Sequence, residues 1–149
     1  MIKKIFVISI LCCLSMACDE NMVSPIPNAP VNLVLYLNSM DKSLIGSLSY
    51  KEYTTRRSET DRLGYGGILV INGLGQNLIN LLAYDLACPN EVQRDIKIKP
   101  DNTGLQAICP KCGAIFNIAT GGAPESGSKF WLKRYHVNQS SDTRYIVTY

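Results

Sequence analysis

Short apolar runs, separated by polar and turn-forming residues, fill the chain from about residue 31 onward. Val31 to Leu37 is an apolar, β-branched-rich run of strand length, and Ile68 to Ile71 is typical of a buried strand. Ile96 to Lys99 alternates apolar and charged residues, which predicts a half-exposed strand. No helical period extends beyond two turns, and no internal repeat occurs. The pattern therefore favours strands over helices.

Further strand-length segments complete the predicted set. They are Leu44 to Tyr53, Ile79 to Leu86, Leu105 to Ile108, Ala114 to Asn117, Phe130 to Val137 and Tyr145 to Thr148. Ile79 to Leu86 also has the length of a short helix, because periodicity alone does not separate the two. Thr54 to Arg62 is charged and lacks an apolar face, so it is interpreted as an exposed loop or short helix. Asn72-Gly73 is the strongest turn signal.

About eight short strands between Gly, Pro and Asn turns predict an all-β domain, an antiparallel sandwich or barrel. The length of 149 residues allows one domain of ordinary size. Hydrophobic residues make up 46% of the chain and charged residues 18%, which is a globular balance. Tyrosine accounts for eight of the aromatic residues, and this also favours strands.

The first 17 residues have the features of a secretory signal peptide. Lys3 and Lys4 form a basic start, and Ile5 to Leu14 form an apolar run that is too short to span a bilayer as a stable helix. Small residues, among them Ala17, stand directly before Cys18. Cys12 and Cys13 lie within the signal and would leave with it.

A cysteine directly after a small residue at the cleavage point resembles the lipobox of bacterial lipoproteins. The resemblance implies that Cys18 is acylated on its sulfur and becomes the first mature residue. The partner would then be a membrane, reached through the lipid, and the location the bacterial cell envelope, on the outer membrane, in the periplasm or on the surface. An ordinary signal peptide with incidental cysteines is the alternative.

Asp19 to Pro30 carries three prolines and has no apolar period, so it is interpreted as a flexible, extended tether. The predicted organisation is a signal peptide at 1–17, the lipidated cysteine and tether at 18–30 and a β domain at 31–149. Of 15 basic residues, Lys3 and Lys4 lie in the signal, which leaves 13 against 12 acidic ones. This near-neutral balance lacks the excess of positive charge that is typical of proteins that bind nucleic acid.

The remaining three cysteines lie in two short motifs. The first reads Cys88-Pro89-Asn90-Glu91, and the second reads Cys109-Pro110-Lys111-Cys112-Gly113. The second is typical of a metal knuckle, because two thiolates three positions apart can bind one ion and glycine lets the backbone amides face the sulfurs. A complete site needs a second pair of ligands. Glu91 stands where the fourth cysteine would be.

From about Tyr65 to Tyr149 the chain resembles a Rieske domain, whose family motifs are Cys-x-His and Cys-x-x-His-Gly. Cys88 and Cys109 match the two cysteines, whereas Asn90 and Cys112 stand at the two histidine positions. The glycine- and proline-bearing loop of the family and its returning strand are matched by Gly121-Gly122-Ala123-Pro124, Gly127, Leu132 and Tyr135. The resemblance implies a Rieske-like β-sandwich or barrel with a small two-loop knuckle subdomain. It also implies electron transfer through a [2Fe–2S] cluster.

Three hypotheses follow for the cysteines. Cys88, Cys109 and Cys112 bind zinc, a mononuclear iron or a degenerate [2Fe–2S] cluster, with Asn90 or Glu91 as fourth ligand. Alternatively, two of them form a disulfide, because the cell envelope is oxidising. In the third hypothesis all three are buried thiols without a cofactor.

Two functions from different classes stay open. The domain is either an electron-transfer component that docks to an envelope redox partner, or a cofactor-free structural or binding module on the same scaffold. No motif indicates an independent enzyme. Asp85 and Glu91 are isolated acids, His136 is a lone histidine on a predicted strand, and no phosphate-binding loop occurs.

Overall fold

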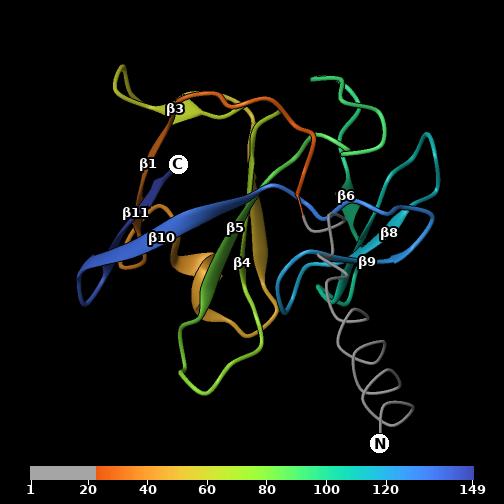
Figure 1. The fold of residues 1–149 in the computed structure, drawn as a ribbon. Coiled ribbons are helices and arrows are strands. Elements are labelled where there is room, and N and C mark those ends of the chain that lie inside the picture. The colour runs from red at the N-terminus through yellow and green to blue at the C-terminus, as the bar shows by residue number, and fades with distance from the viewer. Residues whose placement is uncertain (1–22) are drawn as a thin grey trace, which may run out of the picture.

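The computed structural model describes residues 23–149, and strands make up its regular structure apart from one 3-10 helix (Figure 1). The strands are β1 (Val31–Tyr36), β2 (Tyr50–Tyr53), β3 (Arg62–Leu63), β4 (Ile68–Asn72), β5 (Leu81–Asp85), β6 (Lys99–Pro100), β7 (Gln106–Ile108), β8 (Ile115–Asn117), β9 (Ala123–Ser126), β10 (Arg134–Ser141) and β11 (Arg144–Thr148). The 3-10 helix is η2 (Lys42–Ile45). Every strand pair is antiparallel, so the prediction of an all-β antiparallel fold is confirmed.

The strands form one large and one small sheet. The large sheet has seven strands in the order β2-β4-β5-β10-β11-β1-β3, and the small sheet has four in the order β6-β7-β8-β9. In Figure 1 the small sheet, drawn in teal and light blue, lies beside the β4–β5 part of the large one. The small sheet carries the second cysteine motif, as the predicted small subdomain requires.

Two apolar clusters form the core. The first draws on strands from both ends of the large sheet, which therefore curls around it like a barrel; its fully buried members include Leu33, Leu35, Ile68, Val70 and Val147. The second cluster lies between the two sheets and includes Leu69, Ile71, Tyr84, Ala107 and Phe116. Because successive side chains of β4 point to opposite faces, this strand contributes to both clusters, and its first four residues are all apolar.

The predicted strand from Leu44 to Tyr53 is wrong in its first half. Residues 42–45 form η2, which buries Leu44, and the strand begins only at Tyr50. A turn separates the two elements, in which Ser49 N–H donates to the Gly46 carbonyl at 3.2 Å. The alternation of apolar and small polar residues thus belongs to a largely exposed turn that buries only Leu44, followed by a short strand.

Two other predicted strands begin later than expected. Ile96 to Lys99 is mostly irregular: Lys97 makes an isolated bridge to Ala87, Ile98 inserts into the second core cluster, and β6 starts at Lys99. The strand predicted from Phe130 begins at Arg134. The strand predicted at 79–86 is present as β5, within the shorter bounds Leu81–Asp85. The loop predicted after Tyr53 is present but buries Asp61 and ends at β3, which begins at Arg62. Asn72-Gly73 opens a connection that returns to the sheet at Leu81.

The part of the predicted tether that the structure describes lies on the domain. Ile26 is buried, and the Lys133 ammonium donates to its carbonyl at 2.9 Å and to the Asn28 side chain at 2.6 Å. Tyr149 Oη donates to the same Asn28 oxygen at 2.6 Å. The folded unit therefore begins before Val31.

The predicted signal peptide, Cys18 and residues 18–22 of the predicted tether lie outside the described residues. Within residues 23–149, no helix has the length and apolar character needed to cross a membrane.

Candidate metal site

The three cysteines beyond Cys18 meet between two loops. Cys88 follows β5 and Cys109 follows β7, and both side chains are fully buried. Cys112 lies three residues further along the second loop and is exposed. The structure thus brings together the three residues that the sequence predicts as ligands, with one side open to solvent.

The two loops share one backbone conformation. The N–H of Val92 donates to the Cys88 carbonyl at 3.0 Å, and the N–H of Gly113 donates to the Cys109 carbonyl at 2.9 Å. Val92 has a φ of 51° and Gly113 a φ of 73°, so each loop ends its turn in the left-handed region. This conformation suits glycine and strains a β-branched valine. The loops are therefore a structural repeat in which Glu91 occupies the position of Cys112.

The sulfur atoms are spaced as for a single ion. All three Sγ atoms lie within 4.8 Å of one another, and the Cys88–Cys112 Sγ separation is 3.7 Å. Two thiolates on one tetrahedral zinc, each with a Zn–S distance of about 2.3 Å, have their sulfurs about 3.8 Å apart. All three cysteines are free thiols, so no disulfide joins them. The spacing fits a three-thiolate site.

Main-chain amides face the sulfurs from within the loops. Burial and a hydrogen bond with Cys109 raise the pKa of Cys88 to about 12, against the opposing effect of the Asn90 and Glu91 amides. Burial also raises the pKa of Cys112, but the Ala114 amide and the Asn90 side chain outweigh it and hold that pKa below its usual value. Hydrogen bonds to sulfur of this kind stabilise a thiolate that binds a metal.

Asn90 is held in place beside the cluster. Its Nδ2 donates to the Gly127 carbonyl at 2.7 Å and lies 3.5 Å from Cys112 Sγ, while its Oδ1 accepts from Ser128 Oγ at 2.7 Å. The amide nitrogen rather than the oxygen therefore faces the sulfur. In this arrangement Asn90 is a hydrogen-bond donor to Cys112, and its oxygen is not available as the fourth ligand.

Glu91 is directed away from the sulfurs. Its carboxylate pairs with the Lys111 ammonium at 2.7 Å, and it does not belong to the group of mutually close ligand atoms. The ion pair joins the first loop to the second across the outside of the site. The two fourth ligands proposed from the sequence are thus both engaged elsewhere.

A buried carboxylate fixes the start of the first loop. Asp85, the last residue of β5, accepts from the amides of Gly66 at 3.0 Å and Ala87 at 2.8 Å and from Tyr135 Oη at 2.6 Å. Gly66 is required there, because a Cβ would lie 2.7 Å from the Ala87 nitrogen. In the sequence Asp85 is an isolated acid, because its partner Gly66 lies 19 positions away and no local pattern connects the two.

A two-iron cluster of the Rieske kind does not fit these residues. Such a cluster needs two ligands on each iron, and ligands on different irons must lie farther apart than ligands on the same ion. Here Cys112 is 3.7 Å from Cys88, and Asn90 presents an amide N–H. His136, on β10, is not part of the cluster.

Neither a protein-family model nor a curated protein matches the chain. The site must therefore be interpreted from its own geometry.

Proposed function

We propose that the protein is a domain of the bacterial cell envelope, attached to a membrane through a lipid on Cys18, that binds one metal ion through Cys88, Cys109 and Cys112. The sulfur spacing supports the metal site most directly, since the 3.7 Å separation of Cys88 Sγ and Cys112 Sγ suits two ligands of one tetrahedral ion. The two matched loops also support a metal site, because their main-chain amides donate to the sulfurs of Cys88 and Cys112.

Zinc is the ion that this donor set favours, because thiolates bind it strongly and it requires no electron transfer. Three protein ligands leave a fourth tetrahedral position for water or a small ligand on the side of the exposed Cys112. The ion would join the loop after β5 to the loop after β7, and so the large sheet to the small one. Asn90 would tune the Cys112 thiolate by donating its N–H.

Electron transfer is the second candidate function. The exposure of Cys112 favours it, because a redox iron at this position would lie close to a docked redox partner. The order of the two cysteine motifs, which resembles that of a Rieske domain, also favours electron transfer. The iron would be mononuclear, since the residues do not fit a Rieske cluster.

Cobalt titration of the full chain under reducing conditions tests the proposal. Co²⁺ replaces zinc in thiolate sites and gives intense visible bands in a tetrahedral field. We expect saturation at about one Co²⁺ per chain, with sulfur-to-cobalt charge transfer. Cys112→Ser should weaken binding by at least about tenfold. Glu91→Gln is the matched control and should leave the spectrum unchanged, because Glu91 pairs with Lys111. Weak octahedral bands without charge transfer would contradict the proposal.

The lipid anchor is tested separately. Cys18→Ser should release the protein from the membrane fraction, whereas Cys12→Ser, within the predicted signal, should leave it there. Retention of the Cys18→Ser variant would exclude the anchor without affecting the metal site.

A further inference from the structure

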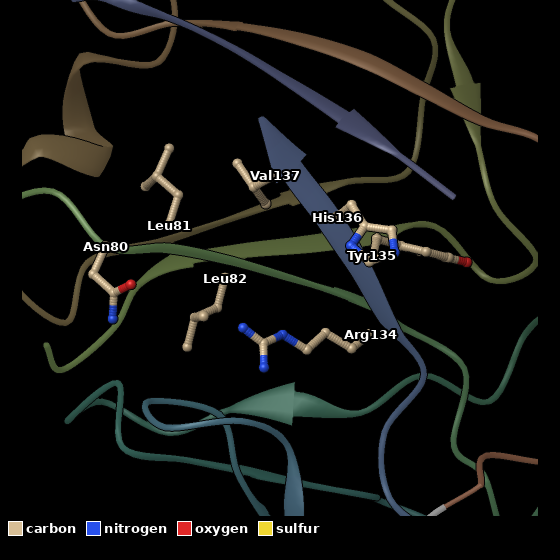
Figure 2. Close-up of a pocket in the computed structure, with 7 residues that line it drawn as sticks. All are labelled: Asn80, Leu81, Leu82, Arg134, Tyr135, His136 and Val137. Atoms are coloured by element: carbon tan, nitrogen blue, oxygen red, sulfur yellow. The ribbon is translucent and has the colours of Figure 1, made fainter. Parts of the chain in front are cut away.

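A hollow of about 530 Å³ lies between β5 and β10, apart from the cysteines. One wall is formed by Asn80, Leu81 and Leu82, and the other by residues 134–137. Figure 2 shows the two walls facing each other, with Arg134 extending from β10 toward Leu82.

The hollow exists because two neighbouring strands separate. β10 pairs with β5 only at Arg134, opposite Tyr84, and at Tyr135, opposite Ala83. From His136 onward β10 pairs with β11 alone. On the other side, the first residues of β5 pair with β4 alone. The two strands thus form a wedge that is closed at Tyr135 and opens toward the far end of β10.

The main chains of Val137 and Leu81 line this wedge without a strand partner. The Lys133 main chain faces β5, because the Asp85 N–H donates to the Lys133 carbonyl at 2.8 Å. In a strand, every second residue directs its main-chain N–H and C=O to the same neighbouring strand. Tyr135 and Val137 therefore also direct their main chain toward β5. The register of β5 and β10 would place Leu81 opposite Val137, but the pairing of these two strands ends at Tyr135. An extended chain can pair with such free edges.

The side chains of the wedge favour a negatively charged occupant. Within residues 23–149, the Arg134 guanidinium makes no ion pair and no hydrogen bond, and no Asp or Glu lines the hollow. A second hollow, of about 450 Å³, shares Arg134 and His136 and is lined by Lys133 and Trp131, again without an acid. A carboxylate would find a planar guanidinium with its donors free, the group best suited to bind it.

We propose that this wedge binds an extended peptide segment, which adds as a short strand between β5 and β10 and pairs a carboxylate side chain with Arg134. Main-chain bonds to Val137 and Leu81 would provide affinity, and the carboxylate would provide selectivity. The peptide site is independent of the metal site, so Cys112→Ser should not affect it.

Two capped heptapeptides test the proposal on the full chain, one alternating glutamate with valine and one alternating lysine with valine. The glutamate peptide should bind and slow hydrogen exchange at the Val137 amide, and the lysine peptide should not. Arg134→Glu should weaken binding of the glutamate peptide by at least about tenfold. Arg56→Glu, on the exposed loop after β2, is the matched control and should not change it.

Equal binding of both peptides, binding of neither, or binding without protection of Val137 would overturn the proposal. Polygalacturonate provides the remaining comparison. If this acidic glycan bound in an Arg134-dependent manner while Val137 exchange stayed unchanged, the hollow would be a glycan site, and the peptide proposal would be wrong.

Discussion

The two sheets are stabilised in different ways. The large sheet encloses an apolar cluster to which strands across its whole width contribute. In this region the buried carboxylates of Asp41 and Asp85 each accept hydrogen bonds from several donors. The small sheet has strands of two to four residues and depends on the opposite face of β4 and β5 for its core. Such short strands need a packed apolar face to be stable, so the contact with β4 and β5 matters most for this region, and the proposed metal link between the loops would add to it.

Removing the buried carboxylate at the end of β5 should have the largest effect. Asp85→Ala leaves the Tyr65, Gly66 and Ala87 amides and Tyr135 Oη without an acceptor and should lower the free energy of unfolding by about 4 kcal/mol. Urea unfolding measures this loss. The control Asp142→Ala, at an exposed position, should change it by less than about 0.5 kcal/mol. A small effect at Asp85 would mean that its carboxylate does not hold these amides and the Tyr135 hydroxyl in place.

Truncating one side chain in each core should separate stability from metal binding. Leu33→Ala in the first cluster and Phe116→Ala in the second should each cost about 3 kcal/mol, since both side chains are fully buried. Only Phe116→Ala should weaken Co²⁺ binding, because Phe116 shares a cluster with Cys88 and Cys109. Equal effects on Co²⁺ affinity would show that the two regions are not distinct.

Relaxing the backbone should give a smaller and opposite effect. Val92 and Leu48, with φ of 51° and 59°, are the two non-glycine residues with positive φ in the described chain. Val92→Gly and Leu48→Gly should each raise the free energy of unfolding by about 1 kcal/mol, because glycine adopts this conformation without strain. Thermal unfolding measures both changes. Only Val92→Gly should alter the Co²⁺ affinity, because Val92 ends the loop that carries Cys88. A change of Co²⁺ affinity in Leu48→Gly would contradict the assignment of the metal site to the cysteine loops.

The smallest effect is expected from acid on the large sheet. Burial alone would raise the pKa of Asp41, but the Tyr36 amide, Tyr53 hydroxyl and the Lys51 and Arg57 cations hold it below its ordinary value of 3.8. A lowered pKa in the folded state stabilises the protein above about pH 4, and this contribution is lost as the pH falls further. Between pH 7 and pH 3, the free energy of unfolding measured in urea should fall more for the parent protein than for Asp41→Asn. Equal falls would contradict a stabilising role of the Asp41 carboxylate.

The sequence predicted much of the fold because the signals involved are local. The apolar composition of Ile68 to Ile71 predicts a buried strand, and this strand, like β5, contributes to both cores. Where prediction failed, tertiary contacts decided the conformation. Ile98 alternates with lysines as a strand residue would, yet it is buried by insertion into a core rather than by strand pairing.

The three cysteines of the candidate site could be predicted from the sequence, but the residues that surround them could not. The Cys-Pro motifs identified Cys88, Cys109 and Cys112, because ligand spacing is a sequence property. The Asn90 contacts with Ser128 and Gly127 join residues 37 or 38 positions apart, and no local pattern reports them. The gap between β5 and β10 is a matter of strand register, which sequence specifies weakly where a ladder ends.

The most direct test of the metal site is the metal and inorganic sulfide content of the chain purified without oxygen. A single ion on Cys88, Cys109 and Cys112 predicts about one zinc or iron per chain and no sulfide, with the metal lost in Cys112→Ser. About two irons with two sulfides would contradict it and indicate a two-iron cluster. Absence of both metals would also contradict it and would make the three cysteines free thiols of a cofactor-free domain.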